Sequence, residues 1–309
     1  MRRRDFLRLQ AAAACCLAAG SSLLPLHPLF AQSPADALPD LAVAKGAPAA
    51  ATRAAVELLG GMRAIVSPGQ KVLIKPNMSF ANPPEMATTT HPEVVRELAA
   101  MCKEAGAADI LIMDHPLRSP EACLERSGIR DACRDLDSRM VQAVNAPAFF
   151  ADADIPAGKE MRGNAFLKAV LDADVLIAAP VAKSHGSTGV SLSLKGMMGL
   201  IWDRGSMHSR YNLDEAIVDL YTRLTPALTV VDATRVLTTN GPFGPGKVIT
   251  PQTIIASRDG VAADALAVAS FEWWGRRMQP NQVRHLRLAA ERGLGRIDIE
   301  HLRVQEVVL

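Results

Sequence analysis

The stretch that decides the fold spans residues 175–201 and reads VLIAAPVAKSHGSTGVSLSLKGMMGLI. It opens with the apolar run Val175–Ala179, which Pro180 ends and which a polar segment containing Lys183 and His185 follows. This change from apolar to polar is typical of a buried strand that leads into a functional loop. A solvated turn between two core elements is the alternative, since most polar loop residues only face water.

Three other apolar runs are followed by polar residues in the same way. They are Val72–Ile74 before Lys75 and Asn77, Ile110–Met113 before Asp114 and His115, and Leu228–Val231 before Asp232. Helical patterns separate these strands, and one of them begins at Pro92. Strands that alternate with helices predict an α/β fold, with a mostly parallel doubly wound sheet and helices on both faces.

In such sheets ligands bind beyond the carboxyl ends of the strands, where all these polar residues are expected to lie. The candidate catalytic residues are Lys183, His185, Asp114 and Asp232, and the candidate substrate-binding residues are Lys75, Asn77, Thr89, Thr90 and Lys195. Ammonium groups, hydroxyls and loop amides together suit a carboxylate or a phosphate, so the expected partner is a small anionic ligand. A buried lysine with a lowered pKa could also act as a base or form an imine.

Two further expectations concern this edge of the sheet. The stretch 191–201 is expected to form a helix whose N-terminus, after Thr188, faces the anion. His91 and His185 are candidate ligands of a divalent metal, although no pair of histidines has helical i, i+4 spacing. The cofactor is otherwise unknown. Of the remaining histidines, His285 is expected at the surface because charged residues surround it in the sequence.

The N-terminal residues 1–31 predict a twin-arginine signal peptide rather than a membrane span. Arg2, Arg3 and Arg4 precede a weakly apolar run that Pro25 interrupts, which is short of the roughly 20 apolar residues of a transmembrane helix. The expected partner is therefore the twin-arginine translocase and the expected location the periplasm, with no stable membrane span after cleavage. An uncleaved N-terminal anchor is the alternative. Residues 32–51 are expected to be an Ala/Pro-rich lead-in, and residues 52–309 a single α/β domain.

Charge and cysteine content exclude several classes of protein. Loss of residues 1–31 removes four arginines and one aspartate, which takes the formal net charge from +2 to −1. Aromatic residues make up only 4% of the chain and no basic stripe appears, so nucleic-acid binding is not expected. Cys102, Cys123 and Cys133 contain no C-x-x-C pair, so the usual spacing of a self-contained iron–sulfur site is missing. Whether Cys123 and Cys133 form a disulfide is left open by the sequence.

Several of these segments resemble the family catalogued as domain of unknown function 362. The resemblance rests on Val72–Asn77, Thr89–Pro92, Lys183–His185, Leu194–Gly199 and Asp259–Asp264, which occur in the order expected for the family. It covers nearly all of the chain after the signal, and it implies the fold and the positions of the site without an established reaction. The chain differs from the family pattern at Gly196, where asparagine is usual, and it lacks the ferredoxin-like cysteine clusters of some relatives.

Two functions of different classes fit these observations. The first is an enzyme that acts on a small anionic substrate, and the second is a periplasmic binding or redox-accessory protein without catalysis of its own. An enzyme predicts a tight cluster of titratable groups with shifted pKa values, whereas a solute-binding protein predicts two lobes that close on a hinge.

Overall fold

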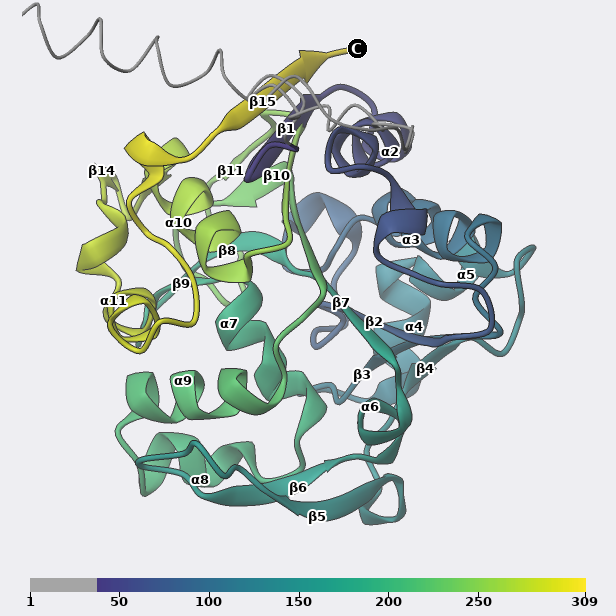
Figure 1. Ribbon diagram of the computed structural model, residues 1–309. Coiled ribbons are helices and arrows are strands. Elements are labelled where there is room, and N and C mark those ends of the chain that lie inside the picture. The colour runs from purple at the N-terminus through teal and green to yellow at the C-terminus, as the bar shows by residue number, and fades with distance from the viewer. Residues whose placement is uncertain (1–37) are drawn as a thin grey trace, which may run out of the picture. The chain divides into compact units, whose positions relative to one another are not determined.

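The computed structural model describes residues 38–309, and its main sheet confirms the predicted α/β fold (Figure 1). The predicted signal peptide lies outside the described residues. The strands of this sheet are β1 Leu41–Lys45, β2 Lys71–Pro76, β3 Asp109–Asp114, β4 Val141–Ala143, β7 Val175–Ala179, β8 Val181–His185, β9 Gly189–Ser191, β10 Leu228–Leu237, β11 Val248–Ile249, β12 Thr253–Ser257 and β15 Val304–Val308. Their order is β15-β1-β12-β10-β7-β2-β3-β4, and β8 and β11 pair with β10 while β9 pairs with β8.

The central strand pairs of the sheet are parallel. The pairs β10–β7, β7–β2, β2–β3 and β3–β4 are all parallel, whereas β12 is antiparallel to both β1 and β10. The carboxyl ends of β2, β3 and β7 therefore lie at one edge of the sheet, and β8 continues from β7 after Pro180. Two hairpins lie apart from the main sheet, β5 Phe150–Asp154 with β6 Gly163–Leu167 and β13 Glu272–Trp273 with β14 Arg276–Arg277.

Helices cover both faces of the sheet, as Figure 1 shows. One group consists of α2 Pro48–Leu58, α3 Pro92–Glu104, α4 Pro120–Ser127 and α5 Ile129–Cys133. The other elements are α6 Lys168–Asp172, α7 Ser193–Gly196, α8 Arg204–Ser209, α9 Leu213–Arg223, α10 Gly260–Ser270 and α11 Arg284–Glu291. Short 3₁₀ turns complete the chain, namely η2 Met62–Ala64, η3 Pro84–Met86, η4 Pro147–Phe149, η5 Met197–Leu200, η6 Pro280–Gln282 and η7 Ile299–His301.

Alternate residues of each central strand enter two separate cores. Val72 and Ile74 of β2 belong to the cluster with Leu98 of α3, whereas Leu73 belongs to the cluster with Ile217 of α9. Successive strand side chains point to opposite faces, so an apolar run without alternation is what a sheet covered on both sides requires. Full burial of each such side chain contributes roughly 1.5–3 kcal/mol, which disfavours a shift in strand register.

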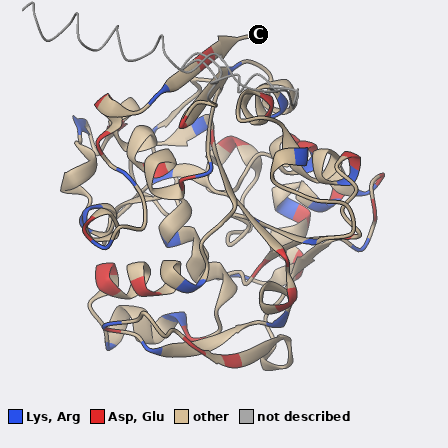
Figure 2. Cartoon of the chain, viewed as in Figure 1, with Lys and Arg blue, Asp and Glu red and all other residues tan. Residues whose placement is uncertain are grey.

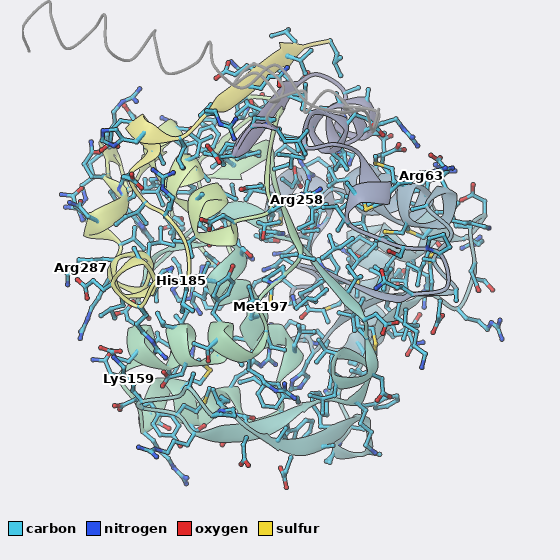
Figure 3. All side chains as sticks on the ribbon, in the orientation of Figure 1. Arg63, Lys159, His185, Met197, Arg258 and Arg287 are labelled. Atoms are coloured by element: carbon cyan, nitrogen blue, oxygen red, sulfur yellow. The ribbon has the colours of Figure 1, made fainter. Side chains whose placement is uncertain are left out.

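Most charged side chains lie outside the two apolar cores. Figure 2 shows Lys, Arg, Asp and Glu spread over the outer helices and loops, with tan ribbon along most of the sheet. In Figure 3, His185 and Met197 lie within the fold, while Arg63 and Arg287 point outward from its periphery. The charged residues buried at the strand ends are therefore exceptions that need an explanation.

The structure corrects the predicted start of the domain and shows the state of the cysteines. The fold begins earlier than residue 52, because β1 pairs with β12 and β15 and lies inside the stretch expected to be a lead-in. Phe166 lies in strand β6, where Ala151 pairs with it across the β5–β6 hairpin. Cys123 and Cys133 are buried free thiols, as is Cys102.

The segment after Thr188 also differs from the prediction. It continues as strand β9, antiparallel to β8, and the helix begins only at Ser193. The amides of Ser193 and Leu194 both donate to the buried carboxylate of Asp264, at 2.9 and 3.0 Å. This helix start is therefore already occupied by a carboxylate of the chain, and the predicted contact with an anionic ligand is wrong.

Candidate functional site

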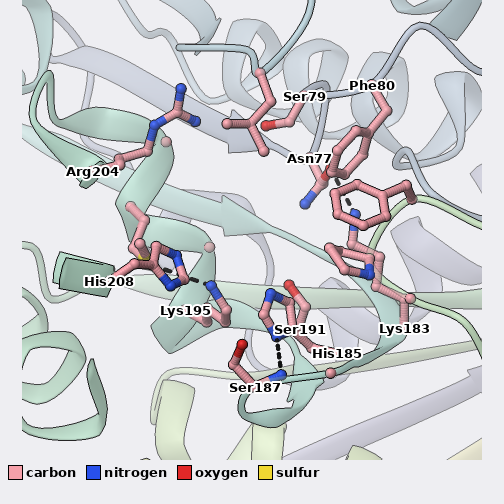
Figure 4. Close-up of a pocket in the computed structure, with 18 of the residues that line it drawn as sticks. Asn77, Ser79, Phe80, Lys183, His185, Ser187, Ser191, Lys195, Arg204 and His208 are labelled. Atoms are coloured by element: carbon pink, nitrogen blue, oxygen red, sulfur yellow. Dashed lines mark hydrogen bonds between the residues drawn. The ribbon is translucent and has the colours of Figure 1, made fainter. Parts of the chain in front are cut away.

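A cavity of about 450 Å³ opens beyond the carboxyl ends of β2 and β8 (Figure 4). Its walls come from these strand ends, from the segment 191–199, from the first turn of α8 and from the loop at Gly241. The lining residues are Lys75, Asn77, Ser79, Phe80, Leu117, Lys183, His185, Gly186, Ser187, Ser191, Lys195, Gly196, Met198, Gly199, Arg204, Gly205, His208, Gly241, Pro242 and Phe243. The set includes three lysines, one arginine and no carboxylate.

Lys195 supplies a buried ammonium group without a strong acceptor. Its side chain is 8% exposed, and the partner of Nζ among the described residues is the thioether sulfur of Met198 at 3.3 Å. Burial, followed by the charge of Arg204, lowers the pKa of Lys195 to about 8. The side chain is thus mostly protonated at neutral pH, with donors that a weak sulfur acceptor does not satisfy.

Arg204 adds a second cation from the start of α8. Its guanidinium donates to the backbone oxygens of His115 at 2.7 Å and Pro116 at 3.1 Å. These carbonyls fix the orientation of the guanidinium but carry no charge, and the negative charge that acts on Arg204 is that of the nearby Asp114. Arg204 and Lys195 therefore make the lining of the cavity cationic.

Lys75 and Asp114 form a buried ion pair beside these two cations. Nζ of Lys75 lies 3.1 Å from Oδ1 of Asp114, and the other carboxylate oxygen accepts from the amide of Met78 and the hydroxyl of Ser79. The pair requires glycine at position 199, because a Cβ there would lie 2.1 Å from Oδ1 of Asp114 and 2.5 Å from Cε of Lys75. Mutual neutralisation makes this pair a support for the site rather than its source of charge.

Lys183 differs from the other two lysines. Its side chain is fully buried, and Nζ donates to Oδ1 of Asn77 at 3.1 Å and to the backbone oxygen of Thr88 at 2.7 Å. Nζ also lies 4.6 Å from the centre of the Phe80 ring. Desolvation holds the pKa of Lys183 well below its usual value, although Asp114 partly opposes this effect. In the neutral form that desolvation favours, the two N–H groups of Lys183 serve the two oxygens and its lone pair remains as a proton acceptor.

His185 and His208 occupy the same side of the cavity as Lys195 (Figure 4). Burial, and then the charges of Lys195 and Lys183, lower the pKa of His185 to about 3. Its Nδ1 accepts from the amide of Ser187 at 3.1 Å, so the neutral ring carries its proton on Nε2. His185 can therefore donate a hydrogen bond to a ligand but does not add charge at neutral pH.

The structure separates the remaining predicted residues from the cavity lining. Asp232 is buried and accepts from the amide of His91 at 2.7 Å and from the amide and hydroxyl of Thr234. Thr90 bridges Asn77 and Ala179 through its hydroxyl. These contacts connect strand ends to the start of α3, which is a structural role.

Two other predicted residues also lie off the lining. Thr89 is buried, and its hydroxyl has no hydrogen-bond partner among residues 38–309. His91 caps α3, with Nδ1 accepting from the amide of Glu93. The two candidate metal ligands, His91 and His185, thus both use Nδ1 as an acceptor, which places the proton on the nitrogen that would bind a metal. The described part of the chain contains no group of three His, Cys, Asp or Glu side chains arranged to hold a metal ion.

Sequence reasoning missed several lining residues and misplaced one histidine. Arg204, Phe80 and the Gly241–Phe243 loop carry no motif that marks them, and they reach the cavity only through the folding of distant segments. His285, expected at the surface, is fully buried, with Nδ1 3.3 Å from Oδ1 of Asp214. Helix α11 has a strongly amphipathic pattern, and this periodicity could have indicated that His285 faces inward.

Fold and site together define the class of protein: a doubly wound α/β protein with a cationic cavity at the carboxyl edge of its parallel strands. Within this class, the chain belongs to the family described as Domain of unknown function (DUF362), which matches residues 72–269. This match confirms the resemblance seen in the sequence motifs. All the lining residues of the cavity fall inside the matched range.

Two known proteins are similar to the chain. The thylakoid-associated protein sll1697 of Synechocystis sp. is 28% identical over 201 residues, which cover 63% of this chain and 61% of that protein. The lactate racemase apoprotein from Thermoanaerobacterium thermosaccharolyticum aligns with a TM-score of 0.45 and 13% identity, over 71% of this chain and 54% of that one. The chain therefore spans less than two thirds of the length of either protein. Within residues 38–309, no helix combines the length and apolarity needed to cross a bilayer.

Proposed function

We propose that the protein is an enzyme that binds a small carboxylate or phosphate in this cavity. It would remove a proton from the bound molecule by general-base catalysis. The observation that carries the proposal is the buried ammonium group of Lys195 beside the partly buried guanidinium of Arg204, both facing a cavity lined by no carboxylate. A buried ammonium group whose acceptor is a thioether sulfur is costly, so a ligand that pairs with Lys195 is the best explanation of this arrangement.

The proposed role of each cavity residue follows from its hydrogen bonds. Lys195 and Arg204 would hold the anionic group by charge-assisted hydrogen bonds. Lys183, with both N–H groups donated to Asn77 and Thr88, would accept a proton from the bound molecule through its lone pair. His185 would donate from Nε2 to an oxygen of the same ligand. Desolvation lowers the pKa values of the lysines, as general-base chemistry near neutral pH requires.

Ligand binding is tested first, with a thermal-shift screen of small carboxylates and phosphates. The native protein should be stabilised by at least one anion, and Lys195→Met should bind that anion roughly ten- to a hundredfold more weakly, the range for hydrogen bonds to charged groups. Lys103→Met, at an exposed position of α3, is the matched control and should bind as the native protein does. If no anion stabilises the native protein, or if both variants behave alike, the anion site is refuted.

Catalysis is tested separately, by exchange of ligand protons in D₂O followed by NMR. The native protein should exchange a proton next to the anionic group, and Lys183→Met should stop the exchange while still binding the anion through Lys195. Binding without exchange in the native protein would favour the alternative, a binding or redox-accessory protein without catalysis of its own.

We also propose that the chain is exported to the periplasm through the twin-arginine translocase, as Arg3, Arg4 and Phe6 of the N-terminal motif suggest. Replacement of Arg3 and Arg4 by lysine should leave the protein in the cytoplasm. Undiminished delivery of this variant to the periplasm would contradict the proposal.

A further inference from the structure

The cavity has a cationic floor and an apolar mouth. We call Lys195 and Arg204 the floor of the cavity and Leu117 and Phe243 its mouth. Leu117 and Phe243 also line the cavity, and each is 53% exposed. Large hydrophobic side chains with this exposure are few among residues 38–309, and these two line the same cavity. Single exposed apolar residues need no explanation, but a pair that lines the same cavity as Lys195 and Arg204 does.

Both mouth residues are held in place by the same loop. The amide of Leu117 donates to the backbone oxygen of Ser79 at 3.0 Å, and the side chain of Asn82 donates to the backbone oxygen of Phe243 at 3.1 Å. The Phe243 ring also packs edge-on against Phe80, with centroids 5.5 Å apart. The mouth is thus an ordered apolar surface, already positioned for contact with a ligand.

The size of the cavity excludes a bare anion as its full occupant. A volume of about 450 Å³ corresponds to roughly 15 water molecules at ~30 Å³ each. Acetate or phosphate would displace only a few of these waters and would leave Leu117 and Phe243 exposed. A ligand that also covers the mouth must carry an apolar body attached to its anionic group.

From these observations we infer that the substrate class is an amphipathic acid, in which a carboxylate or phosphate is joined to an apolar body about the size of an aromatic ring. The anionic group lies at Lys195 and Arg204, and the apolar body lies against Phe243 and Leu117. This inference rests on the proposed anion site and adds the part of the ligand that the cations do not recognise.

The test compares acetate, 3-phenylpropionate and the neutral 3-phenylpropionamide in ligand-observed NMR titrations. The native protein should bind 3-phenylpropionate at least about tenfold more tightly than acetate, because burial of apolar surface adds roughly 25 cal/mol per Å². The amide should bind much more weakly than the acid, since it lacks the charge that the lysine and the arginine recognise.

Two variants test whether the tighter binding of 3-phenylpropionate depends on the apolar mouth. Phe243→Ser should lose about tenfold in affinity for 3-phenylpropionate and keep the affinity for acetate. Phe149→Ser removes a comparably exposed phenylalanine that does not line the cavity, and it should bind both acids as the native protein does. Urea unfolding of each variant establishes that the exposed substitutions leave the fold intact.

The outcomes separate this inference from the proposed function. Equal binding of both acids, or equal behaviour of Phe243→Ser and Phe149→Ser, overturns the amphipathic substrate while the anion site stands. Equal binding of the amide and the acid, or no binding of any acid, overturns the anion site and this inference together.

Discussion

Replacement of Lys195 by methionine should stabilise the protein while it abolishes tight anion binding. The pKa of Lys195 is lowered from 10.5 to about 8 in the fold, chiefly by burial. The unfolded chain therefore binds more protons than the folded one between pH 8 and 10.5, and the free energy of unfolding rises with pH across this window. Below pH 8 the native protein bears the full cost of the buried charge, which is about 3 kcal/mol at ~1.4 kcal/mol for each pKa unit. Methionine keeps most of the apolar stem and removes this cost.

Urea unfolding of the native protein and Lys195→Met, at several pH values from 7 to 10.5, measures the effect. The variant should be more stable at pH 7, and the difference between the two proteins should shrink by about 3 kcal/mol as the pH rises through the window. Lys103→Met serves as the control and should show no such narrowing. A difference that stays constant with pH would refute the reasoning, because it would mean that the fold does not penalise the charge on Lys195.

Three further predictions follow from the same contacts. The pKa of His185 is lowered to about 3, so the free energy of unfolding should fall by ~1.4 kcal/mol per pH unit below 6.5 on account of this residue. His185→Gln should remove that part of the acid sensitivity in urea titrations, and an unchanged pH slope would contradict it. Gly199→Ala should destabilise the fold by roughly 1–3 kcal/mol through collision with Asp114, whereas Gly196→Ala, where a Cβ meets nothing within 4 Å, should be nearly neutral by the same measurement. Because His91 and His185 both carry their proton on Nε2, replacement of either by alanine should not change the transition-metal content of protein purified without chelator, and a metal lost with either side chain would show that the assigned tautomers are wrong.

The sequence was sufficient to predict the sheet and three cationic positions of the site. Apolar runs such as Val72–Ile74 are long enough to identify buried strands, and the rule for parallel sheets then places the residues after them at one edge. Lys75 and Lys183 line the cavity for this reason, whereas Lys195 reaches it from helix α7. The prediction needed only local patterns and one general property of the fold.

The remainder of the site depends on pairings between distant segments. The sequence did not predict strand β9, which pairs with the polar strand β8. Residues 189–191 lack the alternation of apolar and polar residues that indicates a strand. Arg204 reaches the cavity because Phe166 of the β5–β6 hairpin bridges to Ile201, just before α8. Asp232 was predicted to be catalytic because it follows an apolar run in the sequence. In the structure its carboxylate accepts hydrogen bonds from the amides of His91 and Thr234. Which hydrogen bonds a polar residue makes is decided by tertiary contacts that no single sequence reveals.

The hydrogen bonds to Asp264 make one wall of the cavity sensitive to substitution, whereas the apolar mouth tolerates it. Because Ser193 and Leu194 are fastened to α10, the backbone that carries Lys195 is anchored to the core of the domain. The mouth around Phe243 belongs to a surface loop, where substitutions and insertions are tolerated far better than in a core. Homologues could thus diverge in the acids they accept by altering that loop alone, and the same loop is the natural place to begin if the ligand range is to be redesigned.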